Sequence, residues 1–232
     1  MVETGIIDEN GPYLLGLAQS FLYSMRRERV KGTCVFCDRK NFEERIIAET
    51  SLLYYVATLG QITDGGYTLV IPKRHVSCVA AMREGEVAEI DRAAEKASSA
   101  IKAEYGIRPI LFEHGVVGQT VQHAYLHLVP AKIRLCGRIS RDFPGRVYFL
   151  PSLEILRWVR KNIPGGRKYL FWSTPEGLLK AVADPPAPPQ YLRTITAELM
   201  GRPERANRWN MDPELDRKLW SSTVTRLAPY LR

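Results

Sequence analysis

Hydrophobic positions recur at helical spacing in two stretches of the first half of the chain. Residues 11–29 carry an apolar stripe that ends in a basic cluster, formed by Leu14, Leu17, Phe21 and Met25. Residues 84–105 carry a second stripe, formed by Val87, Ile90, Ala94, Ala97 and Ile101. Such spacing places side chains on one face of a helix, so both stretches predict amphipathic helices. Gly106 ends the second helix, because glycine readily adopts the left-handed conformation that follows a helix.

Shorter apolar runs predict β-strands. Before Pro130 these are residues 45–50, 52–58, 67–71, 107–113 and 121–129. After Pro130 the pattern predicts a helix over 152–162, a hairpin from 168–172 and 178–182, and helices over 190–200 and 213–227. We therefore expect an α+β fold in three parts, which are an N-terminal helical segment (1–30), a main domain (31–145) and a C-terminal α/β extension (146–232).

Composition and charge narrow the class of protein. With 45% hydrophobic and 25% charged residues, the chain has the composition of a globular protein. Its apolar runs are too short to span a membrane and its N-terminus has no secretion pattern, so we expect a cytoplasmic protein without a membrane partner. The net charge of +8 suits a polyanionic ligand, such as a nucleotide polyphosphate or a nucleic acid. Many basic residues follow Ala131, and we interpret them as a solvated surface in preference to a nucleic-acid groove.

The candidate metal ligands are four cysteines and four histidines. Cys34 and Cys37 stand as Cys-x-x-Cys, while the other two cysteines are isolated in the sequence. In a cytosolic chain this spacing favours metal or redox chemistry over a disulfide framework. A structural zinc site takes four ligands from cysteine and histidine, and the chain has enough of both.

Residues 118–130 carry the chemistry. Strand side chains alternate between two faces, so one face of 121–129 has a core-like pattern, formed by Ala124, Leu126 and Leu128. The opposite face aligns three ring side chains, those of His123, Tyr125 and His127, at spacings of ~6.6 Å. We expect this second face to line a ligand site.

These residues resemble the signature of the histidine-triad (HIT) superfamily, His-x-His-x-His preceded by Gly-Gln-Ser/Thr-Val. The chain departs from it at Tyr125, where the family has its middle histidine. Residues 66–76 are similar to the superfamily's Gly-His-x-Leu-Val-Ile-Pro-Lys-x-His segment, and Cys34-Val-Phe-Cys37 is similar to a motif that opens many bacterial members. The resemblance covers roughly residues 30 to 132 and implies an antiparallel sheet with one long amphipathic helix.

The resemblance also implies a metal site. In zinc-bearing relatives the ligands are the paired cysteines, the histidine that ends the Pro-Lys-x-His segment, and the first triad histidine. The corresponding residues in this chain are Cys34, Cys37, His75 and His123, which would hold a structural Zn²⁺. The alternative is that two buried thiols and two hydrogen-bonded imidazoles only lie near one another.

In active relatives the middle histidine attacks the α-phosphorus of a nucleotide, and the resulting adduct is then resolved by water or a second substrate. Tyr125 occupies this position, His127 and His114 are the candidate auxiliary groups, and the phosphate contacts would be Gly118, Gln119, Thr120 and His127. A phenol has an ordinary pKa of about 10, against about 6.5 for imidazole, so it is the poorer nucleophile at neutral pH.

Two functions follow from this resemblance. One is a nucleotidyl hydrolase or transferase that acts on a purine nucleotide derivative or a dinucleoside polyphosphate, with activity impaired or altered by Tyr125. The other is a catalytically inactive module that senses a nucleotide or binds another protein. The resemblance leaves a homodimer open, and nucleic-acid binding rests on charge alone.

Overall fold

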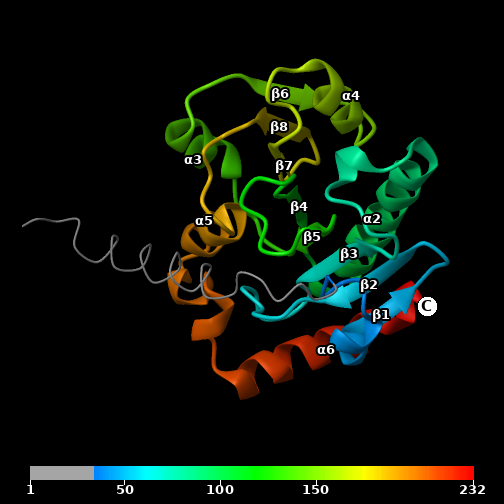
Figure 1. Cartoon of the computed structure of the whole chain (residues 1–232). Coiled ribbons are helices and arrows are strands. Elements are labelled where there is room, and N and C mark those ends of the chain that lie inside the picture. Colours follow the sequence, from blue (N-terminus) through cyan, green and yellow to red (C-terminus); the bar gives the residue numbers. More distant parts are fainter. Residues whose placement is uncertain (1–33) are drawn as a thin grey trace, which may run out of the picture. The chain divides into compact units, whose positions relative to one another are not determined.

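An eight-stranded antiparallel sheet runs through residues 34–232, the part of the chain that the computed structural model describes (Figure 1). Its strands are β1 (Ile46–Glu49), β2 (Leu53–Ala57), β3 (Thr68–Pro72), β4 (Ile110–Glu113), β5 (Leu126–Val129), β6 (Val147–Leu150), β7 (Tyr169–Ser173) and β8 (Leu179–Ala183). The α-helices are α2 (Glu84–Tyr105), α3 (Leu135–Asp142), α4 (Ile155–Asn162), α5 (Tyr191–Leu199) and α6 (Pro213–Leu231). Short 3-10 helices are η1 (Arg39–Asn41), η2 (Glu43–Arg45), η3 (Val79–Ala81), η4 (Pro203–Arg205) and η5 (Arg208–Asn210). The helix expected over 11–29 and the segment 1–30 lie outside the described residues.

The strand order is β1-β2-β3-β5-β4-β7-β8-β6, and each neighbouring pair is antiparallel. The first five strands come from residues before 131, and the last three come from the C-terminal extension. Phe112 in β4 faces His127 on one side and Trp172 of β7 on the other. The extension thus continues the sheet and covers the strand edge that β4 would otherwise expose.

Helix α2 has the bounds that its hydrophobic stripe predicts. The Glu86 carboxylate accepts a hydrogen bond from the Arg83 amide at 2.8 Å and so satisfies a backbone donor at the start of the helix. Gly106 ends the helix with φ of 71°, in the left-handed region.

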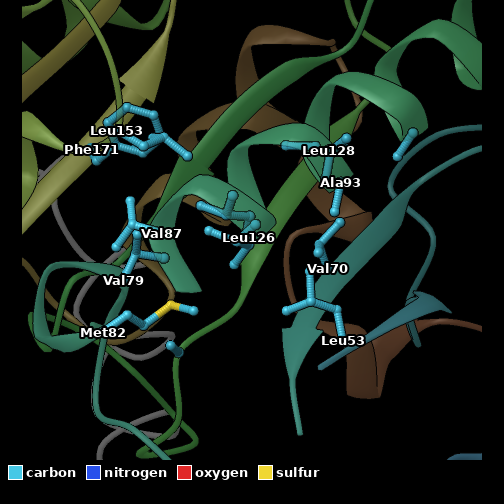
Figure 2. Close-up of a cluster of buried hydrophobic side chains, with 14 of the residues drawn as sticks. Leu53, Val70, Val79, Met82, Val87, Ala93, Leu126, Leu128, Leu153 and Phe171 are labelled. Carbon is cyan, nitrogen blue, oxygen red and sulfur yellow. The ribbon is translucent and has the colours of Figure 1, made fainter. Parts of the chain in front are cut away.

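Side-chain alternation divides the core into two layers, one on each face of the sheet. The first layer packs α2, α4 and α6 against the sheet and includes Leu126 and Leu128 (Figure 2). The second contains Tyr125 and Val129 and is covered by α3 and α5, which lie to the left of the sheet in Figure 1. The second layer therefore holds the ring-bearing face of β5. Within the described part of the chain, no helix is both long and apolar enough to cross a bilayer.

The fold class agrees with the sequence expectation, but the strand expected over 121–129 begins only at Leu126. The residues before it form a loop, in which the Ala124 amide donates to the carbonyl of Val76 at 2.6 Å. Helix α3 and strand β6 are absent from the sequence expectation. Helix α3 has only eight residues and contains Gly137, and β6 is an apolar run of four residues, so both are too short for a period to predict them.

Candidate functional site

Four side chains that are common metal ligands converge beside the end of β3. Cys34 and Cys37 lie in one turn, closed by a 2.8 Å hydrogen bond from the Cys37 amide to the Cys34 carbonyl. His75 follows β3 and His123 precedes β5, and the four candidate ligand atoms lie within 4.8 Å of one another. The structure therefore brings together all four residues that the sequence predicts as metal ligands.

The spacing of this cluster suits a single tetrahedral ion. The Cys34 sulfur lies 3.4 Å from Nδ1 of His123, and the Cys37 sulfur lies 3.3 Å from Nδ1 of His75. Ordinary zinc–sulfur and zinc–nitrogen bond lengths would separate such atoms by roughly 3.5 Å in a tetrahedral site. These four residues could bind a metal ion without a large rearrangement.

The hydrogen bond that His123 makes on the side of the ring away from the cysteines also favours metal binding. Its Nε2 lies 2.8 Å from the carbonyl oxygen of Pro72. A carbonyl can only accept, so Nε2 carries the proton and Nδ1 presents a lone pair to the cluster. This carbonyl contact is the usual way in which a metal-bound imidazole is oriented from behind.

Tyr125, directly before β5, and His127, within it, are both buried. Tyr125 is 8% exposed and His127 is 6% exposed. The Tyr125 ring lies 5.2 Å from that of Phe36 and 4.9 Å from that of His127, measured between centroids. His127 also stacks on Phe112 at 4.4 Å. Burial raises the pKa of Tyr125 to about 12, against a hydrogen bond from Thr120 that lowers it.

His114 lies beside His127, with ring centroids 5.7 Å apart. Nδ1 of His127 is hydrogen-bonded to the hydroxyl of Tyr67 at 2.5 Å, and Nε2 of His114 accepts from the Leu192 amide at 3.1 Å. Among residues 34–232, Nε2 of His127 and Nδ1 of His114 have no hydrogen-bond partner. Burial, with the charge of Arg193 adding to it, lowers the pKa of His114 to about 3 and that of His127 well below its usual range.

Gln119 and Thr120, in the loop before β5, lie in different environments. The amide of Gln119 donates to the carbonyls of Ser77 and His123, at 2.9 and 3.3 Å, so this side chain braces the loop. Thr120 is exposed, and it alone of the three predicted loop contacts is open to solvent.

Gly118 of this loop contacts the C-terminal extension. With φ of 69°, it lies so close to the extension that an added Cβ would be 2.5 Å from the carbonyl oxygen of Pro188. The Gln190 amide donates to the Gly118 carbonyl at 2.8 Å. The backbone that approaches Gly118 closely is therefore that of the extension, at the position where a ligand was expected.

No role in the site was predicted from the sequence for three residues: Tyr67, Leu192 and Arg193. Tyr67 stands where the superfamily's Gly-His segment has its histidine, so the motif itself carried a signal for it. Leu192 and Arg193 come from α5, whose amphipathic pattern predicts a helix but not the face of the sheet that it covers.

Comparison with known proteins identifies the domain that holds this site. Residues 39–133 match the family model described as the HIT domain. A HIT family protein from Bacillus anthracis is 30% identical to this chain, over 42% of this chain and 72% of that protein, with a TM-score of 0.38. The chain belongs to the HIT family. The matched segment contains His75, His114, His123, Tyr125 and His127, and it ends before the extension.

Other HIT structures are also similar. A HIT family member from Bacillus subtilis is 25% identical over 43% of this chain and 73% of that chain, with a TM-score of 0.38. A hypothetical histidine triad nucleotide-binding protein from Sulfolobus tokodaii is 24% identical over 42% and 68%, also with a TM-score of 0.38. These TM-scores add nothing to the family assignment, which rests on the family model and on sequence identity. No curated protein matches the chain.

Proposed function

We propose that this HIT protein binds a purine nucleotide or a dinucleoside polyphosphate, with the α-phosphate beside Tyr125 and His127. The observation that carries the proposal is a pair of buried ring nitrogens without hydrogen-bond partners among the described residues, on His127, whose ring lies beside that of Tyr125, and on His114, whose ring lies beside that of His127. Buried polar atoms without partners are costly, and they are tolerated where a ligand supplies the missing partner. A HIT domain supports a phosphate as that ligand.

In this proposal the Cys34, Cys37, His75 and His123 cluster holds a structural Zn²⁺. The fit of the four ligand atoms to a tetrahedral ion supports it, as does the carbonyl behind His123. Bound zinc would supply a cross-link between the turn at Cys34 and the sheet. It would also fix the loop that leads from His123 into β5.

The reaction proposed for this site is hydrolysis or transfer at the α-phosphate, slowed by Tyr125. A histidine at position 125 would form a bond to the phosphorus and release the rest of the substrate as leaving group. A phenol needs a base to remove its proton, and the ring of His127 approaches that of Tyr125 only to a centroid distance of 4.9 Å.

This geometry also favours a second candidate, an inactive module that senses a nucleotide. The hydroxyl of Tyr125 has Thr120 as its hydrogen-bonding neighbour, and threonine is not a base at neutral pH. The extension covers the same layer, with Pro188 against Gly118. Such a module would keep the phosphate contacts of the HIT domain and lose turnover.

Substitution of Tyr125 distinguishes the two candidates. Whether the protein is a slow enzyme or an inactive sensor, an imidazole at position 125 restores the nucleophile. We therefore expect Tyr125→His to raise the rate of hydrolysis of a nucleoside phosphoramidate or of diadenosine tetraphosphate by about 100-fold or more. For a slow enzyme, the natural chain should form a nucleotidyl-tyrosine adduct that intact-mass measurement detects and Tyr125→Phe abolishes. For a sensor, no adduct forms and Tyr125→Phe still binds AMP. Fast hydrolysis that persists in Tyr125→Phe would contradict both.

A further inference from the structure

The direction of the hydrogen bond at His114 follows from its partner. The Leu192 amide can only donate, so Nε2 of His114 is the acceptor, and the proton of the neutral ring resides on Nδ1. His114 is 3% exposed, and Nδ1 has no partner of ordinary hydrogen-bond geometry among the described residues; a weaker contact of the ring with the Gln190 backbone opposes the lowering of its pKa. The ring is therefore a fixed donor, and its orientation is set by the C-terminal extension.

At His127 the proton position depends on Tyr67. The Tyr67 hydroxyl is hydrogen-bonded to Nδ1 of His127 at 2.5 Å, and the guanidinium carbon of Arg193 lies 5.8 Å from the centroid of the Tyr67 ring. A guanidinium has no acceptor, so among the described residues Nδ1 of His127 is the acceptor for the phenol proton. The phenol then gives its own proton to Nδ1 of His127, and the neutral ring keeps its proton on Nε2.

Arg193 itself is a buried cation whose hydrogen bonds go to backbone carbonyls. It is 4% exposed, and it donates to the carbonyls of Gly60, Arg205 and Ala206 at 2.5, 3.0 and 2.9 Å. Within residues 34–232 no carboxylate lies within ion-pair distance of it. A buried charge without a counter-ion is costly, and an anion bound nearby would offset that cost.

We propose that Arg193 is a positioning residue of the HIT site, which through Tyr67 holds His127 with its Nε2–H directed at the ligand. Together with the Leu192 amide behind His114, α5 turns two histidines into a pair of N–H donors for one oxyanion. This inference rests on the proposed function for the identity of that oxyanion, a phosphate group of the nucleotide. The proton positions, on Nε2 of His127 and Nδ1 of His114, do not depend on the nucleotide.

The four histidines of the chain make a direct test practical. We would label histidine with ¹⁵N in the zinc-loaded full chain and record the couplings between ring nitrogens and ring protons, which report the tautomer of each ring. The expected result is a proton on Nε2 of His127 and on Nδ1 of His114. A proton on Nδ1 of His127 would overturn the proposal.

Three variants then test the role of Arg193 and Tyr67. Tyr67→Phe removes only the hydroxyl and should leave His127 as a mixture of tautomers. Arg193→Met should have the same effect, and Arg193→Lys, which keeps a donor and the charge, should restore the Nε2–H form in part. The matched control is Tyr191→Phe, since the Tyr191 hydroxyl bonds Asp142 away from both histidines. An unchanged His127 tautomer in folded Tyr67→Phe would contradict the proposal.

Binding of AMP by calorimetry separates this inference from the proposed function. We expect Tyr67→Phe to weaken AMP binding about tenfold, the loss of one oriented hydrogen bond to a charged group, and Tyr191→Phe to leave it unchanged. If the natural chain has the expected tautomers but does not bind AMP, the proposed nucleotide site is wrong and the positioning by Arg193 stands. If AMP binds equally to the natural chain and to Tyr67→Phe, the positioning role is wrong and the nucleotide site stands.

Discussion

Two histidines four positions apart, His123 and His127, have opposite environments in this protein. Both ring nitrogens of His123 have partners: Nε2 is hydrogen-bonded to the carbonyl of Pro72, and Nδ1 faces the sulfur of Cys34. His127 has one nitrogen on Tyr67 and one without any partner among the described residues. Both ring nitrogens of His123 therefore have polar neighbours within the chain, whereas Nε2 of His127 lacks an acceptor among the described residues.

The difference shows how one short segment serves two purposes. Loop geometry places His123 beside segments that supply soft ligands, and β5 places His127 in a layer of aromatic and aliphatic side chains. A polar atom in such a layer is expensive to leave unpaired, so its retention points to a ligand and not to stability. We therefore expect substitutions around His123 to act mainly on stability, through metal binding. We expect substitutions around His127 to act mainly on function, through ligand binding.

The largest expected effect concerns the metal cluster. Cys34→Ser should reduce bound zinc from about one ion per chain to almost none, because a tetrahedral site loses one of its four ligands. The free energy of unfolding should fall by on the order of 4 kcal/mol, the range typical of a lost structural metal. Metal analysis and urea unfolding measure the two effects.

Cys136→Ser is the matched control for this prediction. Cys136 is also partly buried, but its sulfur contacts Lys180 at 3.4 Å and not the cluster. It should keep full zinc content. Protein that is prepared without chelators and contains no zinc would contradict the metal site, and the four side chains would then be only buried neighbours.

A smaller effect concerns the loss of stability in acid that His114 causes. Burial lowers the pKa of His114 to about 3, so the folded state keeps this ring neutral while the unfolded state takes up a proton below about 6.5. Stability is then lost as the pH falls from 6.5 toward 3. Between pH 7 and pH 5 the natural chain should lose about 2 kcal/mol more than His114→Gln, measured by urea unfolding. Equal losses would contradict a buried neutral ring.

The neighbouring Glu113 provides a control of opposite sign. Burial raises the pKa of Glu113 to about 7, with its carboxylate bonded to the Val79 amide and to Tyr169. The folded state therefore holds a proton that the unfolded state releases above about 4.5, and stability falls as the pH rises from 4.5 to 7. Glu113→Gln should remove this loss and leave the loss that His114 causes.

The smallest effect concerns the exposed loop residue of the nucleotide site. Thr120→Val should weaken AMP binding by about 1–2 kcal/mol, because a hydroxyl partner of the phosphate is lost. Thr225→Val, on the exposed face of α6, is a control whose hydroxyl bonds only its own helix, at the Ser221 carbonyl. Equal AMP affinity in both variants would remove Thr120 from the site.

The sequence was informative where a period or a family motif fixed the geometry. The stripe over 84–105 predicts α2 with its bounds, and the order of Cys34, Cys37, His75 and His123 predicts a cluster that the structure brings together. The covering of β5 could not be predicted, because Pro188 and Arg193 lie far beyond it in the chain. Their place depends on how β7 pairs with β4, and no local pattern encodes that pairing.

The central claim is that Nε2 of His127 and Nδ1 of His114 receive a phosphate, while Nδ1 of His75 and both ring nitrogens of His123 already have partners within the chain. We would titrate the zinc-loaded, ¹⁵N-histidine-labelled chain with AMP and follow all four rings in one spectrum. The account predicts that the Nε2 signal of His127 and the Nδ1 signal of His114 move together at millimolar AMP or below, and that His75 and His123 do not move. Movement confined to His75 and His123, or none at all, would contradict it.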